Sequence, residues 1–181
     1  LSFSIGFATS GGRVSLRNTF RKADDRMLSD KLHRSAKIKS QLVNTLTVAL
    51  AERDSSTKKH AKCLQKLCPE LGKRIGLSVR NQDDLALLAR VHDLGKVGIP
   101  DSILFKKGPL TPAQRAIMQE HPEKGYRIAS SSPELAPIAR LILCHHERWD
   151  GQGYPLGLKG KAIPLECRIL ALADAYDADR K

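Results

Sequence analysis

From residue 55 to residue 181 the apolar residues recur at helical spacing, and no segment alternates apolar and polar residues as a strand does. Glycine and proline interrupt this pattern at short intervals, for example at Gly76, Gly95 and Pro122. Hydrophobic residues make up 41% of the chain and aromatic residues only 4%, so aliphatic side chains must fill most of the core. The pattern predicts an all-helical domain over residues 55–181.

Local signals set the expected ends of these helices. Thr111 and Gln114 form a capping-box pattern with proline between them, which starts a helix that Pro122 should stop. The expected helices are Thr57 to Ile75, Asn81 to about Leu94, Thr111 to His121, a helix opened by Ser132-Pro133 that carries His145 and His146, and a last helix opened by Ile163-Pro164.

The first residues follow a different pattern. Residues 1–9 alternate, with Phe3, Ile5 and Phe7 on one face, which predicts a strand. Ser15 then resembles the N-cap of a helix. A strand and one helix cannot cover both faces of the strand, so we expect this piece to be incomplete.

Between the two patterns, the apolar residues from Ala36 to Glu52 keep roughly helical spacing and predict a connecting helix. Its apolar stripe is expected to pack within the chain, with packing on a second subunit as the alternative. The expected domains are residues 1–35, 36–54 and 55–181.

Charge is unevenly distributed along the chain. The formal net charge is +12, and the first 80 residues carry almost all of the excess. We interpret it as a solvated helix surface, with attraction of an anionic partner as the alternative. Aromatic residues are not interleaved with the basic ones, which argues against binding of single-stranded nucleic acid.

The bulk features also bound the compartment. No apolar run approaches the roughly 18 residues of a membrane span, and the start "LSFSIGFATSGGR" has no initiator methionine or signal pattern. We therefore expect an internal, cytoplasmic piece of a longer protein whose absent upstream regions would carry any membrane anchor. The 4 cysteines form no CxxC pair, so we expect free, mostly buried thiols.

Histidines and carboxylates give the strongest functional signal. A lone histidine is usually a core or surface residue, but most of the 6 histidines have informative neighbours. Asp93 follows His92 directly, and Asp174 lies in the apolar helix "ILALADAYDA", where an unpaired carboxylate is costly to bury. The histidines taken together are His60, His92, His121, His145 and His146.

Helix geometry constrains what these residues can do. Adjacent helix residues point about 100° apart, so His145 and His146 should not easily serve one ion but should flank a cleft that holds two. His92 and Lys96 should share a helix face, which would place a cation beside a metal held by His92 and Asp93. Imidazole and carboxylate ligands suit iron, manganese or zinc, and the lack of thiolates argues against a structural zinc site.

Three segments resemble the HD-GYP family, phosphodiesterases of cyclic di-GMP within the HD hydrolase superfamily. They are "HDLGKVGIPDSIL", "MQEHPEKGYRI" and "HHERWDGQGYPLGLKGKAIP". The segments around His60 and Asp174 are similar to the family's first and last metal helices. The resemblance covers about residues 40–181 and implies an all-α domain with a metal cluster between its helices.

The resemblance also implies roles for individual residues. Catalysis would rest on His92, Asp93 and Lys96, with Asp93 bridging two divalent ions, iron or manganese, and Lys96 holding the scissile phosphate. The implied metal ligands are His60, His92, Asp93, His121, His145, His146 and Asp174. The implied substrate-binding residues are Lys96, Arg148, Asp150, Gly151, Gly153, Tyr154 and Pro155.

Two positions depart from the family pattern. Members with a third ion have a glutamate one turn before the first histidine, where this chain has Ser56, so we expect two metals, without Glu52 or Asp54 as ligands. Similar proteins continue past the last aspartate to an arginine-rich substrate motif. Here either Arg180 stands in a shortened version of that motif, or the chain was cut.

The N-terminal piece is similar to the C-terminal end of a GGDEF domain, the diguanylate cyclase fold. The resemblance rests on "LSFSIGFAT" followed by "FRKADDRMLSDK". The cyclase signature is not in this chain, so no cyclase activity is assigned. The implied parent is a GGDEF–HD-GYP tandem.

The leading hypothesis is therefore hydrolysis of cyclic di-GMP to linear pGpG, with further cleavage to GMP left open, by a hydroxide that bridges two metal ions. The alternatives are a non-hydrolysing cyclic dinucleotide sensor and an HD hydrolase of another nucleotide. Cyclic di-GMP is the expected partner, and nucleic acid is not. A homodimer through the connecting helix and GGDEF-type signalling partners stay open.

Overall fold

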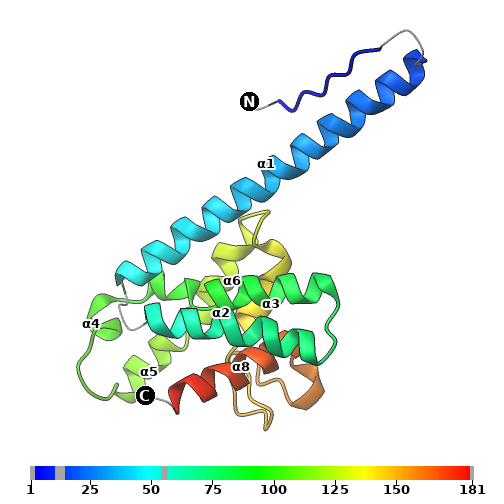
Figure 1. Ribbon diagram of the computed structural model, residues 1–181. Coiled ribbons are helices and arrows are strands. Elements are labelled where there is room, and N and C mark those ends of the chain that lie inside the picture. Colours follow the sequence, from blue (N-terminus) through cyan, green and yellow to red (C-terminus); the bar gives the residue numbers. More distant parts are fainter. Residues whose placement is uncertain (1–2, 11–14, 54–56, 180–181) are drawn as a thin grey trace. The chain divides into compact units, whose positions relative to one another are not determined.

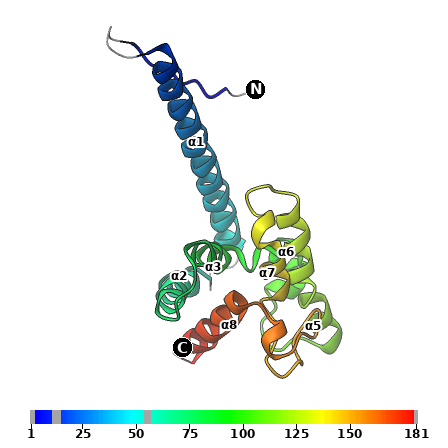
Figure 2. The same ribbon diagram turned by 90° about the vertical axis from the view of Figure 1, so that its right-hand side faces the viewer.

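The computed structural model describes residues 3–10, 15–53 and 57–179, and those residues contain helices but no strand (Figures 1 and 2). The helical prediction for residues 55–181 is confirmed over the part that the structure describes. In chain order the elements are α1 (Leu16–Arg53), α2 (Thr57–Arg74), α3 (Val79–Val91), the 3-10 helix η1 (Leu94–Gly98), α4 (Asp101–Leu104), α5 (Pro112–Met118), α6 (His121–Ser130), η2 (Ala136–Ile138), α7 (Ala139–Cys144), η3 (Gly160–Ala162) and α8 (Leu165–Ala178).

The chain divides into two compact units, Leu1–Asn44 and Thr45–Lys181. In the first unit the strand predicted for residues 1–9 is not formed, because residues 3–10 adopt no regular secondary structure. A strand needs a partner strand for its backbone groups, and this segment meets a helix instead. Arg26 donates a hydrogen bond to the carbonyl of Phe7 at 2.7 Å. Leu1 and Ser2 lie outside the described residues.

Helix α1 is one continuous helix of 38 residues, where the sequence suggested two helices meeting near residue 35. The predicted start is confirmed, because the hydroxyl of Ser15 accepts a hydrogen bond from the amide of Asn18 at 3.4 Å. The boundary between the compact units falls within this helix. The domain boundaries at residues 35 and 54 stay predictions.

Within the second unit, α2, α3 and α8 pack together, while α6 packs against η1 and α7 (Figure 2). Helices α3 and α8 also contact α7, which joins the two groups. Gly95 in η1 lies so close to α6 that a side chain there would collide with the backbone of His121 and Gly125. The fully buried residues include Leu64, Leu85, Leu88, Leu94, Ile138, Ile142 and Leu170.

Two helices have ends that differ from those predicted from apolar spacing and capping residues. Helix α3 begins after Ser78, whose hydroxyl accepts from the amide of Asn81, so Ser78 and not Asn81 is its N-cap. It ends at Val91 and not at Leu94. Helix α7 ends at Cys144, so His145 and His146 follow the helix and do not lie in it.

The capping box at Thr111 and Gln114 is present as predicted, with both hydrogen bonds formed. The helix it starts, α5, ends at Met118 and does not reach His121. Pro122 therefore does not end α5. It lies in the first turn of α6, where the absence of its N–H costs no hydrogen bond.

The prediction of mostly buried thiols is confirmed. All four cysteines are free, and Cys68, Cys144 and Cys167 are buried as predicted. Among the described helices, none combines the length and hydrophobicity that crossing a bilayer requires.

Candidate metal centre and substrate pocket

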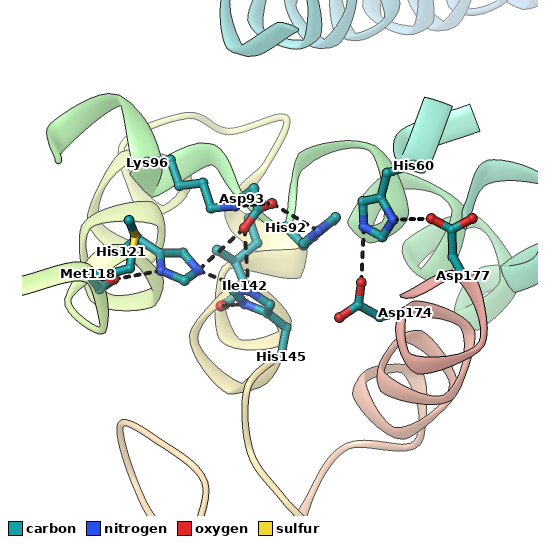
Figure 3. Close-up of polar contacts among 10 residues, drawn as sticks. All are labelled: His60, His92, Asp93, Lys96, Met118, His121, Ile142, His145, Asp174 and Asp177. Atoms are coloured by element: carbon teal, nitrogen blue, oxygen red, sulfur yellow. Dashed lines mark hydrogen bonds and ion pairs between the residues drawn. The ribbon is translucent and has the colours of Figure 1, made fainter. Parts of the chain in front are cut away.

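A pocket of about 550 Å³ gathers most of the residues that the sequence singled out. Its walls come from α2, α8, the turn after α3 and the segment after α7. Figure 3 shows Asp93, His121 and His145 on one side of His92, and His60 with α8 on the other. The predicted residues that line the pocket are His60, His92, Asp93, Lys96, His145, His146, Arg148, Tyr154 and Asp174.

The turn after α3 places the carboxylate of Asp93 on the same side of His92 as His121 and His145 (Figure 3). Its Oδ1 lies 3.4 Å from Nε2 of His121, and its Oδ2 lies 3.3 Å from Nε2 of His92. Lys96 in η1 donates to the same Oδ2 at 2.9 Å. The predicted shared helix face of His92 and Lys96 is wrong, because α3 ends before His92 and the lysine reaches Asp93 instead.

Two buried imidazoles point unprotonated nitrogens at each other. Nδ1 of His121 lies 2.9 Å from the carbonyl of Met118, and Nδ1 of His145 lies 2.6 Å from the carbonyl of Ile142. Each Nδ1 must therefore carry the proton, which leaves lone pairs on the two Nε2 atoms. These atoms are only 3.2 Å apart. Facing lone pairs repel unless a cation lies beside both, so this arrangement fits a metal ion.

His146 joins this pair. Asp93, His121, His145 and His146 each offer one ligand atom, and these atoms lie within 4.8 Å of one another. The prediction that His145 and His146 cannot easily serve one ion is wrong, because both follow the end of α7 and the 100° helical separation does not apply. Their ring centroids are 4.1 Å apart.

The protonation states suit ligands. Burial lowers the pKa of His121, lowers that of His145 well below its usual value, and lowers that of His146 to about 4. Burial alone would raise the pKa of Asp93, but His92 and Lys96 hold it well below its usual value. The group therefore presents neutral imidazoles and an ionised carboxylate, the forms that bind divalent metals.

The other side of the pocket joins α2 to α8. Nε2 of His60 lies 3.0 Å from Oδ1 of Asp174, and Nδ1 lies 2.7 Å from Oδ2 of Asp177. The hydrogen bond with Asp174 raises the pKa of His60. His92 stands between the sides, with its ring centroid 6.2 Å from that of His60 and 5.4 Å from that of His145. Its Nδ1 is buried without a hydrogen-bond partner in the described part of the chain.

The glycine-rich loop after α7 covers one wall. Tyr154 stacks on His146 with ring centroids 4.9 Å apart, and burial raises the pKa of Tyr154 to about 12. Arg148 and Asp150 form an exposed ion pair of 2.6 Å. Of the predicted substrate-binding residues here, Arg148 and Tyr154 line the pocket.

The remaining predicted substrate-binding residues of this loop, Asp150, Gly151, Gly153 and Pro155, do not line the pocket. Gly151 has a φ of +82°, which favours glycine. Gly153 lies so close to the backbone of Glu147 and Arg148 that no side chain fits. These two glycines therefore shape the loop.

The sequence reasoning missed two carboxylates that contact other parts of the site. Glu147 is only 4% exposed, and its two oxygens accept hydrogen bonds from the amides of Leu156 and Leu158, each at 2.7 Å. No sequence signal indicates partners nine and eleven residues away. Asp177 lies three residues after Asp174, and that i,i+3 spacing on one helix face was a usable signal.

Some predictions fall on residues that the structure does not describe. Ser56, Asp54 and Arg180 lie outside the described residues, and the side chain of Glu52 is likewise not described. The expectation of two metals and not three therefore stays a prediction, as does the role of Arg180.

The sequence is similar to several proteins that are named cyclic dinucleotide phosphodiesterases. The chain is 41% identical over 140 residues to the cyclic di-GMP phosphodiesterase of Thermotoga maritima, an alignment that covers 76% of this chain and 38% of the relative. It is 39% identical to the cyclic di-GMP phosphodiesterase response regulator RpfG of Xanthomonas campestris, over 76% of this chain and 37% of that protein.

The 3'3'-cGAMP-specific phosphodiesterase 2 of Vibrio cholerae is 41% identical over 76% of this chain and 27% of its own length. The chain thus spans well under half the length of each of these relatives. The family model for the HD domain matches residues 24–181. That match covers most of the chain and includes every residue of the pocket, and the chain therefore belongs to the HD domain family.

Proposed function

We propose that this chain is an HD-GYP phosphodiesterase domain that hydrolyses cyclic di-GMP to linear pGpG. The observation that carries the proposal is the pair of facing Nε2 atoms of His121 and His145, 3.2 Å apart beside the Asp93 carboxylate. Relatives at 41% and 39% identity that are named cyclic di-GMP phosphodiesterases support the substrate. Further cleavage to GMP stays open.

We propose that the pocket holds two divalent ions, iron or manganese. Asp93, His121, His145 and His146 would hold one ion, and a second set of ligands would hold the other, with Asp93 shared. The second set is His60, His92, Asp93 and Asp174. Divalent ions bound there would lower the pKa of a water and stabilise charge on phosphate oxygens.

The chain's own residues position the substrate. The side chain of Lys96 is 24% exposed and lines the pocket, and its ammonium is paired with Asp93, so it can bind a phosphate oxygen next to the proposed ligands. Arg148 is exposed on the pocket wall and ion-paired with Asp150, and a second phosphate can compete with that carboxylate for its guanidinium. Tyr154 keeps the His146 ring in place by stacking on it.

A second candidate substrate is 3'3'-cGAMP. The support is the relative of Vibrio cholerae that is named for this specificity and is also 41% identical. The two cyclic dinucleotides differ in one base, so the metal ligands cannot distinguish them. A non-hydrolysing sensor is the other alternative, and turnover separates it from an enzyme.

The remaining expectations about context are proposals as well. The GGDEF origin of residues 1–35 is supported by the sequence pattern alone. A homodimer through the connecting helix, residues 36–54, is supported by the exposed apolar side chain of Val48. The four free cysteines suit a reducing compartment, so we place the domain in the cytoplasm.

The proposal predicts different effects for a ligand and for the lysine. We expect protein purified anaerobically with Fe²⁺ or Mn²⁺ to convert cyclic di-GMP to pGpG. Asp93→Asn should lose metal and activity together. Lys96→Met should lose roughly 10² to 10³ in kcat, because it removes stabilisation of phosphate charge. It should weaken metal binding less than Asp93→Asn does, because it removes the ion pair of Asp93 and not the ligand itself. Metal analysis and product chromatography check both results.

Lys107→Met is the matched control, because Lys107 is exposed and does not line the pocket. Metal-loaded protein that binds cyclic di-GMP without turnover would contradict the enzyme and support the sensor. Faster cleavage of 3'3'-cGAMP than of cyclic di-GMP would identify 3'3'-cGAMP as the preferred substrate.

A further inference from the structure

A second hollow lies beside the metal pocket. It is an open groove of about 480 Å³, and Glu147, Arg148 and Ala171 line both it and the metal pocket. The two hollows therefore share a wall, of which Arg148 is the exposed charged member. A ligand larger than one phosphate that reaches the metal pocket can extend across Arg148 into the groove.

The groove presents an aromatic ring and aliphatic side chains. Trp149 is 60% exposed and Leu172 is 63% exposed, although both are large and apolar. Ile163 and Ala171 complete the apolar lining, and the ion pair of Arg148 with Asp150 forms part of the polar lining. Exposed side chains of this kind gathered in a groove are typical of a binding site for a flat organic group.

The guanidinium group of Arg168 lies over the indole ring of Trp149. Cζ of Arg168 lies 5.8 Å from the ring centroid of Trp149, within cation–π range. Its Nε is buried and has no hydrogen-bond partner among the residues that the structure describes. An indole face beside an arginine is the combination that proteins use to stack nucleobases, and arginine also donates to the O6 and N7 acceptors of guanine.

We infer that this groove, which we call the Trp149 groove, binds one guanine base of the cyclic dinucleotide while the scissile phosphate lies in the metal pocket. Trp149 stacks on the base, and Arg148 on the shared wall contacts the second phosphate. The inference rests on the proposed function for its ligand. It adds a base subsite that the metal ligands and Lys96 do not provide.

Binding is testable without turnover, because Trp149 is the only tryptophan of the chain. Cyclic di-GMP mixed with metal-loaded protein should quench the tryptophan fluorescence saturably before product forms, since a guanine stacked on the indole quenches its emission. GMP should quench at higher concentration, and inorganic phosphate should not. Unchanged emission at concentrations of cyclic di-GMP that saturate hydrolysis would contradict binding of a base in the Trp149 groove.

A kinetic measurement separates base binding from a structural role. Trp149→Ala should raise KM for cyclic di-GMP roughly tenfold, the size of one lost base–aromatic stack, and leave metal content and thermal stability close to wild type. Trp149→Phe should recover most of the affinity. Phe105→Ala, at an exposed aromatic outside both hollows, is the matched control and should leave KM unchanged.

The two proposals fail in different ways. Quenching by cyclic di-GMP without hydrolysis would contradict the proposed phosphodiesterase activity but support base binding in the Trp149 groove. Hydrolysis with an unchanged KM in Trp149→Ala would contradict base binding in the Trp149 groove but support the proposed phosphodiesterase activity. A variant that loses metal and melting temperature together would show that Trp149 only supports the fold, and would also overturn the inference.

Discussion

His60 contacts two carboxylates of α8, one through each ring nitrogen. Asp177 lies 2.7 Å from Nδ1 and Asp174 lies 3.0 Å from Nε2. If Asp174 shares a metal with Nε2, the Nδ1 proton must point to Asp177, and this contact fixes both the tautomer and the ring orientation. Asp177 is thus a positioning residue that acts through His60.

Asp177→Asn should therefore weaken one metal site. The amide is uncharged and makes Nε2 a poorer donor, so we expect a 10- to 100-fold loss of metal affinity. Competition with a metal-binding dye measures this loss without reference to turnover, and Asp177→Glu should recover part of it.

The control for this prediction is Asp179→Asn, an exposed aspartate at the end of the same helix. Equal metal affinity in Asp177→Asn and Asp179→Asn would show that the carboxylate at 177 does not orient His60. A loss of folding in Asp177→Asn, seen by circular dichroism, would mark a purely structural role.

At the scale of elements, the proposed ligands lie at helix ends more often than inside helices. His92 and Asp93 follow α3, His121 starts α6, and the adjacent pair His145 and His146 follows α7. Apolar periodicity found most of these helices, but it continued each pattern through the ligands and missed α6. Periodicity reports which face is buried and not where the backbone turns, so the ends had to come from the structure.

The loop after α7 depends on one buried carboxylate. Glu147 binds the amides of Leu156 and Leu158 and thereby closes the segment that carries Tyr154. Because both oxygens are acceptors for N–H groups, Gln at this position turns one of the two contacts into facing donors. An unsatisfied buried donor costs about 1–3 kcal/mol.

Glu147→Gln should therefore destabilise the domain by about 1–3 kcal/mol in urea unfolding. It should also speed tryptic cleavage after Lys159, an exposed residue of this loop. Glu123→Gln, at an exposed carboxylate of α6, should do neither. Wild-type cleavage kinetics in Glu147→Gln would show that other contacts hold the loop.

At the scale of the molecule, the proposed metal ligands come from elements throughout the second unit. They come from α2, the turn after α3, α6, the segment after α7 and α8, so the helices that form the core also form the pocket. The sequence predicted that these residues would lie together, because the ordered histidine and aspartate motifs resemble a known family; their role as metal ligands stays a prediction. It predicted the first unit poorly, because a strand cannot be inferred without its partners.

Shared packing means that the unit should open as a whole. Cys68 in α2, Cys144 in α7 and Cys167 in α8 are buried, and burial raises the pKa of all three thiols, that of Cys68 to about 12. Thiolates are the reactive form, so these thiols should be inert in the native state. Cys63 is partly exposed and should react first with a disulfide reagent.

We therefore expect one fast-reacting thiol in the native protein, abolished by Cys63→Ser, and three slow thiols that react at one common rate set by opening of the whole unit. Peptide mapping by mass spectrometry identifies each labelled cysteine. Chelation of metal should accelerate the three slow thiols equally, because a metal bound only to the folded unit stabilises it against opening. If Cys167 were labelled well before Cys68 and Cys144, α8 would open on its own, and the pocket would not join the helices into one cooperative unit.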